Sequence, residues 1–366
     1  MGAYQTKLEE IARFDDVTLA VIVPPVWQDP AGDVVLERSH TNGYEMYVDP
    51  LRFNGQFHLH YYPQLKQRLK TFRPDILHMD EEPYNLATWL GVRQARAEGV
   101  RTLFFSWQNI GRRYPFPFNF FERQVLRTVD FALMGNAEAA QVWRAKGYTG
   151  PFRVLPQFGV NPDLFRPPPE RDRGRGFVIG CAGRRLVADK GVDILLHAVA
   201  ELPGIWRVQI AGSGPEQPAL QRLVKELDIS DRVQFDGVIP SNQMPSYLQQ
   251  MDVLVLPSRT MPNWKEQFGR VLIEAMACEV AVIGSDSGEI PNVVGDAGLI
   301  FPEGDVEALR ALLQRVMETV GLRDRLGKAG RKRVLERYTQ AQIAAQTVEV
   351  YRDMTAVQRS EPLAAG

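Results

Sequence analysis

The chain has few cysteines, no long apolar run and almost no net charge. Its 366 residues include only two cysteines, Cys181 and Cys278, which lie in apolar segments and form no metal-ligand spacing. No apolar run is long enough to cross a bilayer, and the first residues carry no signal-peptide pattern. The 43 Lys and Arg nearly balance the 44 Asp and Glu, so no overall field attracts nucleic acid. We therefore expect a cytoplasmic protein with free thiols and no nucleic-acid partner, at most peripheral to the inner face of a membrane.

What is present is a repeated alternation of short apolar runs and helical patterns, in a chain with 45% hydrophobic residues. Such β/α alternation predicts parallel sheets that are covered by helices on both faces. A Pro-rich and then charged stretch, Pro167 to Gly176 (PPPERDRGRG), has the composition of a linker rather than of a core. We therefore predict two doubly wound, Rossmann-like α/β domains, over residues 1–166 and 177–339.

The first domain is expected to lack its opening strand. A helical pattern from Gln5 to Phe14 starts almost at the first residue, and a strand from Asp16 to Val23 follows it. A doubly wound domain normally opens with a strand that becomes central in its sheet. Without that strand, we expect unpaired ladder groups in the first domain and a cost in stability.

A stretch of the second domain, Met251 to Val294, carries two carboxylates beyond the end of a strand. Asp252 to Leu256 reads as a buried strand, a polar loop with Glu266 follows, and Gly269 opens a helical pattern. Ligands of open α/β sheets bind beyond the carboxyl ends of the strands, and helix N-termini attract anions. Glu274 lies in the apolar run VLIEAMA, where it is either on a solvated helix face or partnered by a ligand hydroxyl. The stretch therefore predicts a phosphate site.

A basic pair follows the first strand of the second domain. The loop GRRLVADKG, from Gly183 to Gly191, holds Arg185 and Lys190. Arg offers a planar fork to phosphate oxygens and Lys a compact charge, so the pair can neutralise a diphosphate. Two basic residues in a loop are equally a feature of solvated surface. The turn GSGP that begins at Gly212 is too short for a dinucleotide motif and reads as a tight turn.

The carboxylate stretch resembles the signature of a known family. E-x7-E, present as EQFGRVLIE between a strand ending in LPS and the segment IGSDSGEIPNVV, is similar to that of family 4 retaining glycosyltransferases, which are group 1 glycosyl transferases with the GT-B fold. The resemblance implies a nucleotide-sugar donor as substrate, no further cofactor, no metal, and retention of anomeric configuration. It implies catalytic roles for Glu266, Arg185 and Lys190. It implies donor contacts from Gly183, Val238, Gln267, Phe268, Gly269 and Glu274.

The same resemblance extends over much of the chain, with departures. RPDILH and PQFGVNPDLFRP resemble landmarks of the family's first domain, with Asn161 where Asp is commoner. A last helix, about residues 340–354, is expected to pack back on the first domain. Arg184 and Glu279 stand where the family usually has Gly. Glu279 puts the shape of the turn after the helix in question.

His78, at the end of a predicted strand, is an acceptor-side candidate. Gln108 and Asn109 are also candidates, because they follow the next predicted strand, where many members of the family that this chain resembles have a His. Gln108 cannot accept a proton as a His would, so no general base is assigned. His58 and His60 form H-x-H, which on a strand would point both rings to one face. No carboxylate or Cys at ligand spacing accompanies them, which argues against a metal.

The segment RRYPFPFNFFERQ, from Arg112 to Gln124, interleaves Arg with aromatic residues. Exposed, it would contact an anionic membrane surface or hold a lipid-linked acceptor. Folded down, it is a loop that leads into a core-packing helix, which is the more common outcome for an aromatic cluster.

The sequence thus predicts a hexosyltransferase-type enzyme of polysaccharide biosynthesis that moves a sugar from a nucleotide-sugar to a glycan, lipid-linked or small-molecule acceptor. Two alternatives stay open. One is a nucleotide-sugar epimerase of the same architecture. The other is a catalytically silent nucleotide-sugar-binding protein, which the absent strand and the residues Arg184, Gln108 and Glu279 motivate.

Overall fold

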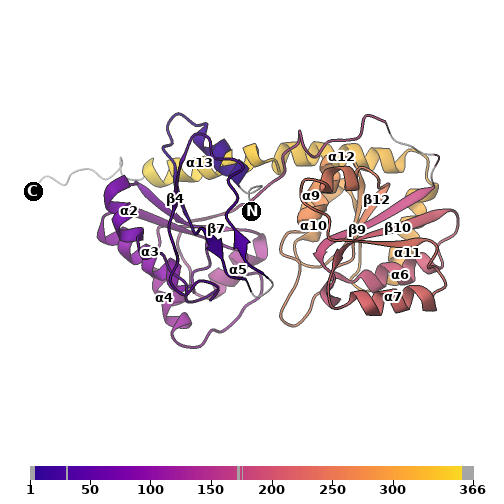
Figure 1. The fold of residues 1–366 in the computed structure, drawn as a ribbon, viewed down its shortest axis with the longest axis horizontal. Helices are drawn as coiled ribbons and strands as arrows, with labels where there is room; N and C mark the ends of the chain where they lie inside the picture. Colours follow the sequence, from indigo (N-terminus) through magenta and orange to yellow (C-terminus); the bar gives the residue numbers. More distant parts are fainter. Residues whose placement is uncertain (1–4, 30–31, 171–173, 175, 357–366) are drawn as a thin grey trace, which may run out of the picture. The chain divides into compact units, whose positions relative to one another are not determined.

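The computed structural model describes residues 5–29, 32–170, 174 and 176–356. The chain divides into two compact units: unit 1 combines Met1–Phe158 with Gln340–Gly366, and unit 2 is Gly159–Thr339 (Figure 1). Unit 2 thus starts before the Pro-rich stretch that the sequence analysis takes as the linker. Val160 pairs with Thr339, and a Cβ on Gly159 would lie 2.3 Å from the carbonyl oxygen of Tyr338. This close contact joins the start of unit 2 to its end.

Unit 2 is built on a six-stranded parallel sheet with the order β11-β10-β9-β12-β13-β14. The strands are β9 (Phe177–Arg185), β10 (Trp206–Ser213), β11 (Val233–Gly237), β12 (Val253–Leu256), β13 (Ala281–Ser285) and β14 (Leu299–Phe301). The residues of β12 and β13 are all buried, as are the first six of β9. A central parallel strand is covered on both faces, which explains why these strands read as continuous apolar runs.

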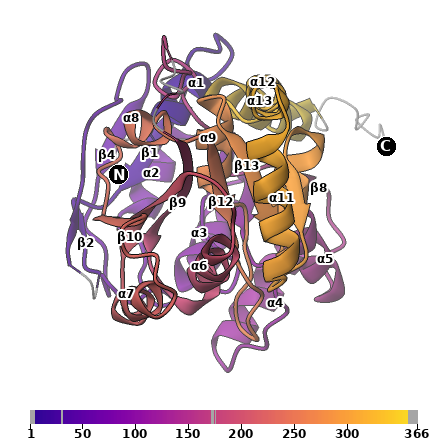
Figure 2. The same ribbon diagram turned by 90° about the vertical axis from the view of Figure 1, so that its right-hand side faces the viewer.

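Helices cover both faces of this sheet (Figures 1 and 2). Along the chain they are α6 (Val192–Ala200), α7 (Gln217–Glu226), α8 (Met244–Leu248), α9 (Arg270–Ala277), α10 (Ile290–Val294), α11 (Val306–Glu318) and α12 (Leu322–Arg337), with short 3-10 turns η2 (Ala188–Lys190) and η3 (Gly295–Ala297). Helices α6, α7 and α11 pack on one face, whereas α9 and α12 pack together on the other. Every loop after a strand therefore opens at the carboxyl edge of the sheet.

Unit 1 contains a four-stranded parallel sheet with the order β5-β6-β7-β8. Its strands are β5 (Ile76–Met79), β6 (Arg101–Ser106), β7 (Phe131–Met134) and β8 (Phe152–Val154). Its helices are α2 (Leu65–Phe72), α3 (Leu86–Ala97), α4 (Phe118–Thr128) and α5 (Ala137–Ala145). The core on one face holds side chains of α3, α4 and α5, including the fully buried Trp143.

The opening segment of unit 1 forms a separate parallel pair. Strand β1 (Ala20–Val23) pairs with β4 (Glu45–Val48), and a short hairpin of β2 (Val26–Trp27) and β3 (Val34–Val35) lies between them in the chain. In the described part of the chain, no ladder joins β1 to β5. The hairpin was not predicted, because two-residue strands leave no periodic signal.

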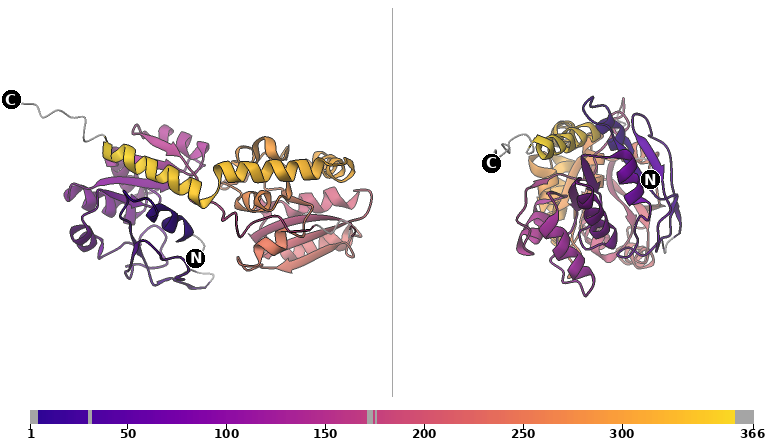
Figure 3. Two further views of the ribbon diagram at one scale, coloured as in Figure 1. Left: turned by 90° about the horizontal axis from the view of Figure 1, so that it is seen from above. Right: turned by 90° about the vertical axis from the view of Figure 1, so that its left-hand side faces the viewer.

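Helices α1 (Thr6–Ala12) and α13 (Gln340–Ala356) pack against each other within unit 1 (Figure 3). Ile11 of α1 lies in a buried cluster with Ala344 and Val348 of α13. Other residues of α13, such as Ile343 and Val350, cover the face of the β5–β8 sheet opposite α3 to α5. The last helix of the chain thus closes the core of unit 1.

Candidate functional site

The carboxyl edge of the unit 2 sheet gathers the loops that carry the predicted donor-side residues. Arg185 ends β9, Ser213 ends β10 and Ser285 ends β13, all at this edge. Val238 follows β11 directly and is 54% exposed. Loops from four strands of the sheet, β9, β10, β11 and β13, therefore open at one edge, although their residues lie far apart in sequence.

Lys190 and Glu266 form the centre of this region. Lys190 Nζ lies 2.9 Å from Glu266 Oε2, and Ser258 Oγ donates a hydrogen bond of 3.1 Å to the same oxygen. Glu266 is 8% exposed. The pair forms because Gly191, at φ 62°, sits against the end of β12: a Cβ there would lie 2.0 Å from the carbonyl oxygen of Pro257. The structure thus brings together two predicted catalytic residues that are 76 positions apart.

A tight loop covers this ion pair with an aromatic ring. Trp264 and Met261 form a two-residue bridge, and the Trp264 ring centroid lies 4.3 Å from Lys190 Nζ. At that distance the ammonium is attracted by the face of the indole. Sequence reasoning missed Trp264, and its only signal was a Trp in an otherwise polar loop between a strand and a helix.

Asp189 is a second residue that the sequence analysis missed. One of its carboxylate oxygens, Oδ1, is buried and has no hydrogen-bond partner among the described residues. Burial raises the pKa of Asp189; nearby Lys190 opposes this shift, Glu266 adds to it, and Arg185 opposes it. The charges of all three predicted catalytic residues, including the exposed Arg185, therefore act on the pKa of Asp189.

Glu274 is buried on α9, which excludes the alternative of a solvated helix face. Its side chain is 9% exposed, and Arg270 Nε lies 2.7 Å from Glu274 Oε1, one turn away. Burial raises the pKa of Glu274, and Arg270 opposes this shift. Within the unliganded helix, Arg270 supplies a cationic partner for Glu274 at the (i, i+4) spacing.

The start of α9 is held by glycines. Gly269 has φ 72° and precedes the first helical residue. A Cβ on Gly288, which follows β13, would lie 2.0 Å from the carbonyl oxygen of Glu266. Phe268 is buried against the ring of Tyr338, with ring centroids 5.8 Å apart, while Gln267 is half-buried. Close backbone contacts at Gly288 and the ring contact of Phe268 therefore hold the loop that carries Glu266.

The glycines of the GSGP turn allow it to pack closely against the backbone of a neighbouring loop. A Cβ on Gly214 would lie 2.3 Å from the carbonyl oxygen of Leu186, and one on Gly212 would lie 2.5 Å from that of Gly183. The turn after β10 therefore lies directly against the loop that carries Arg185. A Cβ on Gly183 itself would meet only the Arg185 carbonyl oxygen, at 3.9 Å, so this position has room for a side chain.

In unit 1, the acceptor-side candidates have partners within the unit. His78 Nδ1 lies 2.8 Å from the Tyr351 hydroxyl, and burial lowers the pKa of His78 to about 4. Gln108 is buried, accepts a hydrogen bond from the Tyr114 hydroxyl at 3.1 Å and donates one to a backbone carbonyl. The Asn109 amide donates to Glu138 at 3.3 Å. These contacts give Gln108 and Asn109 structural roles.

Residues 57–59 form a turn, so the H-x-H pair does not lie on a strand. His58 Nδ1 lies 3.0 Å from Asn85 Oδ1, whereas His60 Nε2 lies 2.9 Å from Glu81 Oε1. The two rings therefore have different partners. Within the residues that the structure describes, no three His, Cys, Asp or Glu side chains gather as a metal ion would require.

Glu82 is a buried acid at the carboxyl end of β5 that sequence reasoning did not single out. Its two oxygens accept hydrogen bonds from the Ser106 hydroxyl at 2.6 Å and from the Trp107 N–H at 2.9 Å. Burial raises its pKa to about 7, despite these hydrogen bonds. Glu82 thus clamps the loop after β6, which carries Gln108.

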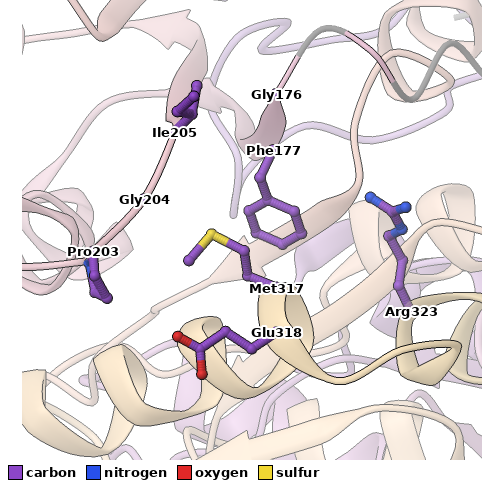
Figure 4. A pocket seen from close by; sticks show the side chains of 8 residues that line it. All are labelled: Gly176, Phe177, Pro203, Gly204, Ile205, Met317, Glu318 and Arg323. Carbon is purple, nitrogen blue, oxygen red and sulfur yellow. The ribbon is translucent and has the colours of Figure 1, made fainter.

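Two surface cavities are lined by residues other than Lys190 and Glu266. One of about 570 Å³ is found at the opposite, amino end of β9, beside Phe177, Met317 and Arg323 (Figure 4). The other, of about 460 Å³, lies in unit 1 beside Arg112, Arg113 and Lys146. Neither is lined by a predicted site residue.

The two units are each Rossmann-like, and unit 2 carries an acidic and basic cluster at the carboxyl edge of its sheet, where α/β folds bind ligands. Residues 171–333 match the model of the family described as glycosyl transferases group 1. The predicted family is thereby confirmed over the segment that contains every donor-side residue.

Individual relatives agree with this assignment. The chain is 35% identical over 205 residues to the MMP alpha-(1->4)-mannosyltransferase of Mycolicibacterium hassiacum. The aligned region covers 54% of this chain and 47% of the mannosyltransferase. The chain spans about half the length of the curated relatives it matches. Among solved structures it resembles the sucrose-phosphate synthase of Thermosynechococcus elongatus, with a TM-score of 0.70, 22% identity, and coverage of 97% and 93% of the two chains. It also resembles HepE of Anabaena in complex with UDP and glucose, with a TM-score of 0.70, 18% identity and 96% of each chain covered. The predicted GT-B fold class is confirmed.

No helix in the described ranges combines the length and apolar character that crossing a bilayer would take.

Proposed function

We propose that the chain is a glycosyltransferase that takes a hexose from a nucleotide-sugar donor and transfers it to an acceptor with retention of anomeric configuration. The observation that carries the proposal is the Lys190–Glu266 pair at the carboxyl edge of unit 2, inside the segment that belongs to the family. A relative named as a mannosyltransferase and a neighbour with bound UDP and glucose support a sugar joined to a nucleoside diphosphate as donor.

The chemistry follows from the charges of the site. As the bond from the anomeric carbon to the diphosphate breaks, negative charge grows on the diphosphate and positive charge on the sugar ring. Lys190 and Arg185 are proposed to stabilise the first, together with the positive end of the helix dipole at the start of α9 beside Gly269. Glu266 holds the sugar so that the acceptor oxygen attacks on the face that the diphosphate leaves.

Binding of the donor requires the ion pair to rearrange. Lys190 Nζ now contacts Glu266 at 2.9 Å, and a phosphate oxygen would compete for that ammonium. Glu266 would retain the hydroxyl of Ser258 and accept new hydrogen bonds from sugar hydroxyls. Glu274 lies one turn into α9, with Arg270 as its present partner, and is proposed to accept the ribose hydroxyls. Gly183, Val238, Gln267, Phe268 and Gly269 complete the proposed donor contacts.

The test is a panel of UDP-, GDP- and ADP-sugars scored for nucleotide release and for thermal stabilisation. Glu266→Ala and Lys190→Ala are expected to abolish transfer. Lys332→Ala and Glu336→Ala, in an exposed ion pair on α12, are matched controls and should leave it unchanged. Transfer that persists in either site variant refutes the site assignment. Isomerised sugar without an acceptor would favour an epimerase, and binding without turnover a silent binding protein.

We also propose that unit 1 meets an anionic membrane surface on the cytoplasmic side. The expectation that the aromatic segment folds down holds for Phe121, which is buried, but not for Phe116, which is 79% exposed. Phe120 is 36% exposed, and Arg123 and Arg127 are exposed at helical spacing from it. An outward face that combines aromatic rings with Arg suits the interface of an anionic bilayer.

Flotation with vesicles that contain anionic lipid tests this surface. Phe116→Ser with Phe120→Ser is expected to lower the bound fraction severalfold. Phe57→Ser, at a position that is 66% exposed elsewhere in unit 1, is the control and should have no effect. No flotation of the unaltered protein rejects the membrane contact and leaves the transfer reaction untouched.

A further inference from the structure

The loop between β12 and α9, residues 257–269, carries two groups of the candidate site. The carboxylate of Glu266 contacts Lys190 Nζ, and the ring of Trp264 lies over the same ammonium. Within this loop, the structure describes one backbone bridge, which joins Met261 to Trp264. A bridge this short is marginally stable by itself, so contacts with neighbouring loops must hold the two groups in place.

Glu303, which follows β14, holds this loop from two strands away. Its Oε2 accepts a hydrogen bond of 2.5 Å from the backbone N–H of Thr260, and its Oε1 accepts one of 2.5 Å from the Thr260 hydroxyl. Strand β13 lies between β12 and β14 in the sheet, so the carboxylate links loops that are not neighbours. Because hydrogen bonds to an ionised carboxylate are roughly twice as strong as neutral ones, this contact favours one conformation of the loop.

The loop after β13 fixes the backbone of Glu303. The N–H of Glu303 donates to Asp286 Oδ1 at 2.8 Å, and the N–H of Asp286 donates to the carbonyl oxygen of Phe301 in β14 at 2.9 Å. The hydroxyl oxygens of Ser287 and Thr260 lie 3.1 Å apart. The loops after β12, β13 and β14 are therefore joined in one hydrogen-bond network.

The residue before Thr260 holds the opposite side of the loop. The backbone N–H of Arg259 donates to the carbonyl oxygen of Asp189 at 2.8 Å, and its guanidinium donates to Asp193 at 2.7 Å. These acceptors belong to η2 and α6, which follow β9. Two consecutive residues thus tie the loop to elements on either side of β12.

We propose that Glu303 is a positioning residue for the donor: it holds the loop so that Glu266 and the ring of Trp264 stand beside the Lys190 ammonium before the donor arrives. This inference rests on the proposed function. The loop is then ordered on folding rather than on binding, which favours tighter binding of the donor. Because Glu303 acts through Thr260, its removal should change donor affinity more than the rate of bond cleavage.

Steady-state kinetics with the UDP-, GDP- or ADP-sugar that the wild type turns over test this role. Glu303→Ala is expected to raise the donor KM about tenfold and to change kcat by less than about twofold, because the loop must order as the donor binds. The effect is limited because Thr260 is exposed and water can replace the carboxylate. Glu307→Ala is the matched control, because its carboxylate is 76% exposed on α11 and pairs with Arg310; it should leave both constants unchanged.

Two further variants separate the hydrogen bonds from the charge. Glu303→Gln should keep the donor KM within about threefold of the wild type, because its amide oxygen can accept the Thr260 N–H and its NH₂ group can donate to the Thr260 hydroxyl. Thr260→Val removes the hydroxyl but keeps the N–H, so it should raise the KM about threefold. In the Glu303→Ala background it should add nothing, because both changes then remove the same interaction. Independent effects of the two changes would overturn the proposal.

Hydrogen exchange gives a readout that needs no sugar transfer. The N–H of Trp264 donates to the carbonyl oxygen of Met261 at 3.2 Å, and its exchange should be about tenfold faster in Glu303→Ala, while amides of β12 stay unchanged. Unchanged exchange, or an unchanged donor KM in a variant whose stability falls, overturns the proposal and leaves the transfer reaction intact. If the wild type turns over no donor, the proposed function fails, and exchange at Trp264 alone decides whether Glu303 orders the loop.

Discussion

The contact between Lys190 and Glu266 makes a quantitative prediction about the free protein. Their charged atoms are 2.9 Å apart, and their side chains are 26% and 11% exposed. Two unit charges at that distance attract by about 1.4 kcal/mol in water and about 6 kcal/mol at an effective dielectric constant of 20. Desolvation and side-chain ordering offset much of this gain. We therefore expect a coupling free energy of about 2 kcal/mol.

A double-mutant cycle measures that coupling. The variants are Lys190→Met, Glu266→Gln and the pair together, and the quantity is the free energy of unfolding of unit 2 from hydrogen exchange at β9 and β12. The control cycle uses Lys332→Met and Glu336→Gln, whose atoms are 3.9 Å apart and whose side chains are 78% and 57% exposed. That exposed helix pair should couple by no more than about 0.5 kcal/mol.

Salt separates the electrostatic part of the coupling from packing. The Lys190–Glu266 value should fall by less than half between low salt and about 0.5 M salt, because partly buried pairs are screened weakly. A coupling no larger than that of the exposed control pair would refute the reasoning, since the two residues would then be independent in solution. A coupling that about 0.5 M salt abolishes would also refute the reasoning, because it would be the behaviour of an exposed pair.

Three further predictions rest on single positions. Burial raises the pKa of Glu82 to about 7. The stability that Glu82 contributes to unit 1 should therefore be full below about pH 4.5 and be lost as the pH rises through 7, by up to about 3 kcal/mol. Urea unfolding at pH 5 and pH 8 should show this loss for the wild type and not for Glu82→Gln. Trp264→Ala should lower kcat/KM for transfer about tenfold, because the Lys190 ammonium loses its contact with the indole face. Trp264→Phe should keep most of the activity. Equal losses in the two variants would contradict a role for the ring face. Glu279→Gly should raise the free energy of unfolding by about 0.5–1 kcal/mol, because Glu279 has a φ of 56°, a left-handed backbone conformation that glycine adopts without strain. A loss of stability would show that the side chain of Glu279 contributes more than its backbone strain costs.

The sequence predicted the β/α elements that have continuous apolar runs. The runs of β12 and β13 and the helix pattern of α9 were found within a few residues, because buried parallel strands leave a strong signal. The three-residue β14 was missed, since so short a run has no period to detect. The partner of Glu274 was available in principle, because Arg270 stands four residues before it on one helix.

The centre of the site depended on contacts that no local pattern encodes. Lys190 meets Glu266 only because Gly191 sits against the backbone of Pro257 at the end of another strand. Trp264 reaches Lys190 through a tight turn inside a loop without periodicity. The family resemblance named Lys190 and Glu266 as partners of one ligand, but not as partners of each other.

The indole ring of Trp264 has a practical consequence for experiments. Its emission depends on the charge beside it, and that charge belongs to a side chain that a diphosphate would draw away. A chain in which the other five tryptophans are replaced would carry one optical label at the proposed donor site. Arrival of a nucleotide could then be timed in a stopped-flow instrument, before any acceptor is known.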